Sequence, residues 1–240
     1  YSREKPEGPT TGTIERWETA GPTKVVDGVL PSGVTAKPMA LSPGRNHLAL
    51  LADNRLHVFE LEKLTSIGQV HLPNEIMGLD PIELNFSPHG NELAAVLNRD
   101  RQKTFALVCW SVADGKVVLS REYDHSTFPE AKLHNYGGGY EGRALEWMPN
   151  GTGWLAFGHQ LLDRSTGEVL ISTPEEGEYP RRFVGNDRLL GISGTRYSDK
   201  VVGTAMLPME DLAKMQAAVQ AGNKAIDGRL GTLVQTNFED

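Results

Sequence analysis

Residues 84–96 read Leu-Asn-Phe-Ser-Pro-His-Gly-Asn-Glu-Leu-Ala-Ala-Val, and altered copies of the centre of this stretch recur along the chain. Residues 42–49 and 148–156 each contain a Pro, a Gly within the next two residues and then an aliphatic run. A weaker copy, residues 183–191, keeps the turn and a Leu pair but lacks the Pro. Recurrence of one unit indicates a repeat architecture, in which each copy is one supersecondary unit.

The spacing of the copies sets the size of the unit. Pro43 and Pro88 are 88 − 43 = 45 residues apart, and Pro88 and Pro149 are 149 − 88 = 61 apart. The longer unit therefore holds roughly 16 residues beyond the period, which we expect to lie in a loop. A second landmark follows each copy, where an apolar residue precedes a polar one: Phe59-Glu60, Trp110-Ser111 and Leu162-Asp163.

These landmarks resemble those of WD-repeat and related bacterial propeller proteins. In that family a Ser-Pro-Asp-Gly-like turn joins the first two strands of a blade, and a Trp-Asp-like pair ends the third strand. The resemblance covers residues 37–206 and implies four short antiparallel strands per unit. The chain departs from the family because no copy has a true Trp-Asp pair and no Gly-His pair precedes the first strand of a unit. We therefore predict a divergent propeller or propeller segment.

The predicted organisation is an all-β propeller-like domain over residues 11–207. A polar arm, 1–10, precedes it, and a C-terminal helix and tail, 208–240, follow it. Pro208, the acidic residues after it and an apolar spacing of 3 to 4 residues predict the helix. Residues 13–18 are a candidate strand that either completes the last blade or belongs to a preceding blade. The four predicted blades are 37–72, 81–122, 143–174 and 180–207, with an inserted loop at 123–142.

Composition and charge narrow the classes of function. A net charge of −7 without a basic run argues against nucleic-acid binding, which needs clustered Lys and Arg to neutralise phosphates. The single cysteine, Cys109, excludes an internal disulfide and lies in an apolar run that predicts a buried core residue. The seven histidines lack metal-ligand spacing, so we expect neither a metal nor a cofactor. No apolar run is long enough to cross a membrane, and we expect no membrane insertion.

The inserted loop at 123–142 is the most aromatic loop in the sequence. Long loops inside repeats are common sites of function, so we expect a protein or peptide partner to bind there. By analogy with other propellers, we expect a non-enzymatic interaction or scaffolding module with no catalytic residues. Because the chain begins at Tyr1 and not at Met, we expect it to be part of a larger protein. A hydrolase or lyase using His125 or His134, an accessory propeller of an enzyme, and a small-molecule sensor remain alternatives. The residues predicted to contact the partner are Tyr123, Phe128, His134, Tyr136 and Tyr140.

Overall fold

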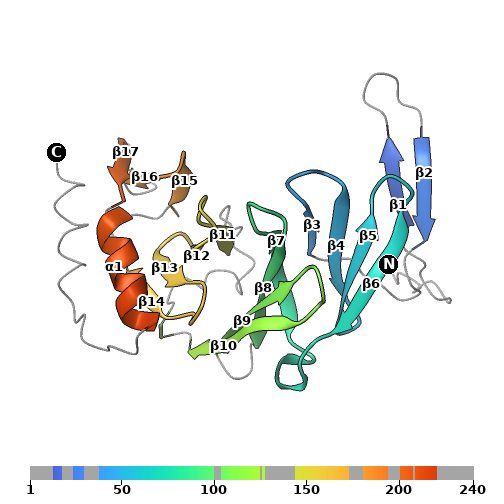
Figure 1. Ribbon diagram of the computed structural model, residues 1–240, viewed down its shortest axis with the longest axis horizontal. Coiled ribbons are helices and arrows are strands. Elements are labelled where there is room, and N and C mark those ends of the chain that lie inside the picture. Colours follow the sequence, from blue (N-terminus) through green and yellow to red (C-terminus); the bar gives the residue numbers. More distant parts are fainter. Residues whose placement is uncertain are drawn as a thin grey trace, which may run out of the picture.

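The computed structural model describes residues 13–17, 24–29, 38–99, 104–124, 126–127, 144–172, 181–193, 201–207 and 209–220. Within these ranges the chain forms antiparallel sheets and one α-helix, α1, which confirms the predicted all-β class with a C-terminal helix. The sheets follow one another in chain order, from the β1–β2 hairpin at one end to α1 and the last sheet at the other (Figure 1). This arrangement is that of a propeller segment.

We call the four main sheets blades 1 to 4. Three have four strands and the last has three in the described part of the chain. Blade 1 comprises β3 (Met39–Leu41), β4 (His47–Ala52), β5 (Arg55–Glu60) and β6 (Thr65–His71). Blade 2 comprises β7 (Asp80–Phe86), β8 (Glu92–Arg99), β9 (Thr104–Ser111) and β10 (Val117–Asp124). Blade 3 comprises β11 (Leu145–Trp147), β12 (Gly153–Ala156), β13 (Gln160–Asp163) and β14 (Val169–Ser172). Blade 4 comprises β15 (Arg182–Val184), β16 (Arg188–Ser193) and β17 (Val201–Met206).

The central strands of blade 2 are buried on both faces. Alternate residues of a strand point to opposite sides of the sheet, so one strand contributes to two cores. Leu93 and Ala95 of β8 join a cluster shared with blade 1, whereas Ala94 and Val96 join a cluster shared with blade 3. This double burial explains why the sequence of β8 reads as a continuous apolar run rather than an alternating one.

Helix α1 (Met209–Gln220) packs against the outer part of blade 3. Its Leu212 and Met215 are buried in a cluster with Leu170 and Ile171 of β14 and Leu189 of β16. Figure 1 shows the helix beside β14 and blade 4. Acidic residues in its first turn, Glu210 and Asp211, complement the positive end of the helix dipole. The helix thus adds its apolar side chains to a core shared by blades 3 and 4.

The N-terminal strand β1 (Thr13–Trp17) forms an antiparallel pair with β2 (Lys24–Val29). Within the described residues, β1 does not pair with blade 4. Both alternatives for this strand, completion of the last blade and membership of a preceding blade, stay predictions.

The strands of a blade have their connections at two opposite ends. At one end of blade 2, Thr104 pairs with both Asp124 and Arg99, and the inserted loop follows Asp124. At the opposite end, Glu92 pairs with Ser111, next to the turns that join β7 to β8 and β9 to β10. We call the first end the loop face and the second end the turn face. The inserted loop therefore begins at the loop face.

No helix in the described part of the chain has the length and apolar character needed to cross a membrane.

Candidate functional site: a polar cleft between blades 2 and 3

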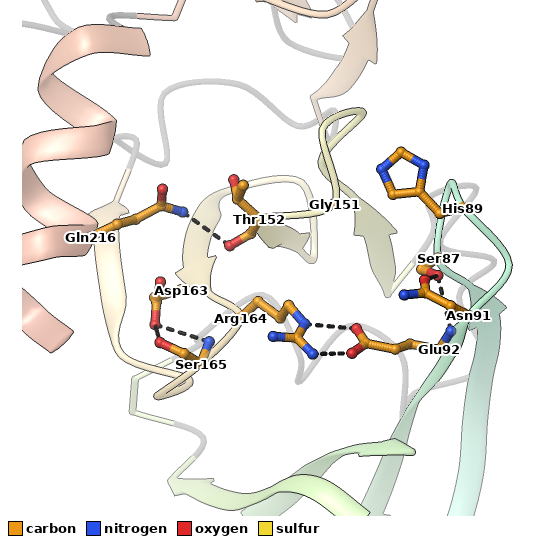
Figure 2. A pocket seen from close by; sticks show the side chains of 10 residues that line it. All are labelled: Ser87, His89, Asn91, Glu92, Gly151, Thr152, Asp163, Arg164, Ser165 and Gln216. Atoms are coloured by element: carbon orange, nitrogen blue, oxygen red, sulfur yellow. Dashed lines mark hydrogen bonds and ion pairs between the residues drawn. The ribbon is translucent and has the colours of Figure 1, made fainter. Parts of the chain in front are cut away.

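A cleft of about 410 Å³ lies on the turn face between blades 2 and 3. Its walls are the β7–β8 turn of blade 2, the β11–β12 and β13–β14 turns of blade 3, and one side chain of α1 (Figure 2). The volume falls within the range of about 300–1,000 Å³ that is usual for ligand sites. The lining residues are polar or glycine: Ser87, His89, Asn91, Glu92, Gly151, Thr152, Asp163, Arg164, Ser165 and Gln216.

The β7–β8 turn is held by hydrogen bonds from its own side chains. The Ser87 hydroxyl accepts the Glu92 N–H at 3.1 Å and donates to Asn91 Oδ1 at 2.9 Å. Gly90 has φ +73°, a left-handed conformation that glycine adopts without a Cβ penalty. Blade 1 repeats the same bonds through Ser42 and Asn46. The recurring Ser-Pro landmark is therefore a structural turn that places Asn91 at the mouth of the cleft.

An ion pair between Glu92 and Arg164 joins blade 2 to blade 3. Arg164 Nε donates to Glu92 Oε2 at 2.7 Å, and Arg164 Nη2 donates to Glu92 Oε1. The Glu92 side chain is 9% exposed and that of Arg164 is 37% exposed. The hydrogen bond to Glu92 raises the pKa of Arg164, so the guanidinium stays charged. The pair fixes the guanidinium in one orientation with its third nitrogen directed away from Glu92.

Asp163 shapes the β13–β14 turn. It ends β13, is buried, and its Oδ2 accepts the N–H groups of Ser165 at 3.0 Å and Thr166 at 2.9 Å. The same oxygen accepts both side-chain hydroxyls, at 2.6 Å from Ser165 and 2.9 Å from Thr166. Because Arg164 directly follows Asp163, this carboxylate fixes the backbone from which the Arg164 side chain reaches into the cleft.

Several polar groups of the cleft are left for a ligand. Three of these groups have no hydrogen-bond partner among the described residues: Arg164 Nη1, Asn91 Nδ2 and the His89 ring. Gln216 donates its amide N–H to the Thr152 carbonyl at 2.9 Å, which leaves the amide oxygen as an acceptor. Figure 2 shows these side chains around the opening, with Arg164 between Gln216 and Glu92. The free groups are mostly donors.

The cleft differs from the site predicted from the sequence. Tyr123, which we expected in the inserted loop, lies in β10, is 7% exposed, and donates its hydroxyl to the Gly167 carbonyl at 2.6 Å. Its ring stacks on Phe105, with ring centroids 5.3 Å apart. The strand thus extends two residues into the predicted loop because the Tyr123 side chain packs between blades. Phe128, His134, Tyr136 and Tyr140 lie outside the described residues, as does His125, and their role stays a prediction.

Sequence reasoning missed the cleft because its walls come from three separate turns and a helix. Glu92 and Arg164 are 72 positions apart. The only available signal was the registered repeat, which aligns Glu92 with His47 of blade 1 and Arg164 with Val112 of blade 2, and so marks each charged residue as a departure from the preceding blade.

The described residues hold no group of three or more His, Cys, Asp or Glu side chains that could bind a metal ion. The thiol of Cys109 is fully buried beneath the cleft, 3.9 Å from Glu92 Oε2, and burial raises its pKa. A thiol in this state is a weak nucleophile, in keeping with its predicted place in the core.

Comparisons with known proteins give a likeness of fold. A solved structure described as a eukaryotic initiation factor matches with a TM-score of 0.50 and 12% identity, over 84% of this chain and 50% of that chain. Hydrazine synthase of Kuenenia stuttgartiensis matches with a TM-score of 0.45 and 12% identity, over 72% of this chain and 46% of that one. A putative 6-phosphogluconolactonase from Bacteroides uniformis matches with a TM-score of 0.42 and 13% identity, over 65% of this chain and 45% of that one.

The chain spans about half the length of the solved chains it matches. No family model and no curated protein matches the sequence. With the antiparallel sheets, the first likeness supports a propeller-like all-β fold, and identity this low carries nothing about function.

Proposed function

We propose that this chain is a non-enzymatic interaction module, a WD-repeat-like propeller segment of a larger protein, which binds a protein partner through the cleft on its turn face. The observation that carries the proposal is the way in which the polar groups of the cleft are used. Ser87, Ser165, Glu92 and Asp163 could supply a nucleophile or a base, but each is hydrogen-bonded within a turn or to Arg164.

The groups that remain suit binding rather than bond-making. A general base must lie within hydrogen-bond reach of the group it activates, and the Ser87 hydroxyl instead donates to an amide oxygen. Two of the remaining donors are held in place, Arg164 by Glu92 and Asn91 by Ser87. A preorganised set of donors loses little conformational entropy when a ligand binds.

Photo-cross-linking from the two faces tests the proposal. A benzophenone amino acid at position 89, on the turn face, should form an adduct with a specific protein from the source organism, which mass spectrometry identifies and purified components reproduce. The matched control is the same group at position 77, which is also exposed but lies in the connection between β6 and β7 on the loop face. Adducts from position 77 alone, or from neither position, would contradict binding at the cleft.

A further inference from the structure

We propose that the cleft recognises the main chain of an extended, uncharged peptide segment, with Arg164 and Asn91 donating to its carbonyl oxygens and Gln216 accepting one of its N–H groups. This inference rests on the interaction role proposed above and specifies its ligand. Main-chain recognition needs both donors and acceptors, because each peptide unit carries one N–H and one C=O group.

Arg164 is the best-placed donor. Two of its three nitrogens are bound by Glu92, and Nη1 has no partner among the described residues. A guanidinium held in this way by a carboxylate keeps a planar, fixed array of donors. Its 37% exposed side chain lies in the wall of the cleft, so a ligand can reach Nη1 without disturbing the ion pair.

The orientation of the Asn91 amide follows from the hydrogen bonds of the turn. The Ser87 hydroxyl accepts the Glu92 N–H, and its own hydrogen is directed at Asn91. The Asn91 amide oxygen accepts that hydrogen, which leaves the NH₂ group on the exposed side. Figure 2 shows that nitrogen directed away from Ser87.

Gln216 and His89 lie on opposite sides of the opening in Figure 2. The bond from Gln216 Nε2 to the Thr152 carbonyl fixes the amide and leaves Oε1 as an acceptor. The exposed His89 ring lies next to Gly151: a Cβ added at that glycine would be 3.5 Å from His89 Cδ2. The two residues thus flank a ligand that crosses from blade 2 toward α1.

Charge favours a neutral ligand over an acidic one. The charge of Arg164 is matched by Glu92, Asp163 adds a further carboxylate to the lining, and the whole chain carries a net charge of −7. A carboxylate would enter a cleft without net positive charge and would be repelled by the protein as a whole. A carbonyl oxygen meets the same donors without that repulsion.

The test uses random peptides displayed on phage and selected on the intact chain. Selected peptides are synthesised with blocked termini, and their dissociation constants are measured by fluorescence anisotropy. The diagnostic variant is Asn91→Asp, which keeps an acceptor for Ser87 but replaces the NH₂ donor by an oxygen. We expect binding to weaken by about tenfold or more, the effect of losing one directed hydrogen bond and gaining a repulsive contact.

The matched control is Asn46→Asp, which makes the same change in the corresponding turn of blade 1, away from the cleft. It should leave the dissociation constant unchanged, while both variants lose similar thermal stability. His89→Phe, which keeps a ring over Gly151, should weaken binding less than Asn91→Asp does, because His89 is at the margin of the cleft.

The outcomes separate this inference from the proposed function. Peptides that bind the Asn91→Asp variant as tightly as the original chain, or that lose binding when an acidic side chain is replaced by alanine, would overturn main-chain recognition and leave the interaction role standing. Failure to select any peptide, together with no cross-link from position 89, would overturn both.

Discussion

The interface between blades 1 and 2 and the interface between blades 2 and 3 use the same repeated turns but are fastened differently. At the interface between blades 1 and 2, the Pro43 ring lies close to Gly90, since a Cβ added at this glycine would be 3.4 Å from Pro43 Cδ. The residues there that correspond to Glu92 and Arg164 are His47 and Val112. Since Val112 carries no charge, the ion pair of the second interface cannot form there.

The contacts made by the outermost strands, β6 of blade 1 and β10 of blade 2, show the same contrast. At the interface between blades 1 and 2, Gly115 lies against the apolar side chain of Val70, and a Cβ on this glycine would be 2.5 Å from a methyl carbon of that side chain. At the second, Tyr123 and Arg121 donate to the carbonyls of Gly167 and Thr166, at 2.6 Å and 2.8 Å. Both glycines have a positive φ and lie directly against the outer strand of the preceding blade.

The contacts between the innermost strands at the interface of blades 2 and 3, β7 and β11, are also polar. Glu83 accepts the Leu145 N–H at 3.0 Å, and Asn85 donates to the Leu145 carbonyl at 2.8 Å. Trp147 donates its indole N–H to the Asn85 carbonyl at 3.2 Å. The repeat thus sets the geometry of each blade, whereas a few substituted positions decide how firmly neighbouring blades are joined. Of the two interfaces, the one with more hydrogen bonds between its blades among the described residues also forms the walls of the cleft.

The largest expected effect comes from breaking the ion pair of the second interface. Glu92→Ala should lower the free energy of unfolding by about 3 kcal/mol, because it leaves Arg164 without its partner in a partly buried position. His47→Ala, at the matching position of blade 1, should cost less than about 1 kcal/mol. Urea denaturation of both variants measures the difference, and equal losses would contradict the contrast between the interfaces.

A smaller effect should come from Gly167. Its φ of +69° is nearly that of Gly185, +68°, but a Cβ on Gly167 would lie 2.8 Å from the Tyr123 hydroxyl, whereas Gly185 has open space. Gly185→Ala should cost about 1 kcal/mol through backbone strain alone, and Gly167→Ala about 2 kcal/mol or more. Thermal unfolding curves that shift equally would show that the contact with blade 2 gives way freely.

Acid should destabilise the chain at a place outside both interfaces. Burial, and secondarily the charge of Arg181, lower the pKa of His159 to about 4, below its ordinary value of 6.5. Between pH 6.5 and 4 the unfolded chain therefore binds more protons, so stability falls as pH falls through this window. We expect His159 to account for a loss of about 1–2 kcal/mol.

Replacing His159 by Gln isolates its share from that of His57, whose pKa is also lowered by burial. The variant should lose less stability than the original chain when the pH is lowered from about 7 to about 4. Identical pH profiles in urea denaturation would exclude His159 as the group responsible.

The smallest expected loss of stability comes from the contact between β10 of blade 2 and the β13–β14 turn of blade 3. Tyr123→Phe removes the hydroxyl that donates to the Gly167 carbonyl but keeps the ring against Phe105, so it should cost about 1 kcal/mol. Peptide binding at the cleft should be unchanged. A variant that kept its stability but lost partner binding would instead support the sequence-based expectation that Tyr123 contacts the partner.

The sequence predicted the blades because the turn chemistry repeats. Ser42 and Ser87 each hold an Asn four residues later, so the landmark in the sequence is the turn itself. The burial of Tyr123 could not be predicted, since an aromatic residue at the end of a strand reads the same whether it faces solvent or a neighbouring blade. The cleft was also missed, because the contact of Glu92 with Arg164 depends on the packing of two blades and no local pattern encodes it.

The most direct test of binding at the turn face is a crystal structure of this chain with a selected peptide. We predict peptide density in the cleft, with a main-chain carbonyl oxygen about 3 Å from Arg164 Nη1 and from Asn91 Nδ2. Peptide density on the loop face near Asp124, with the cleft holding only solvent, would contradict the proposed binding site.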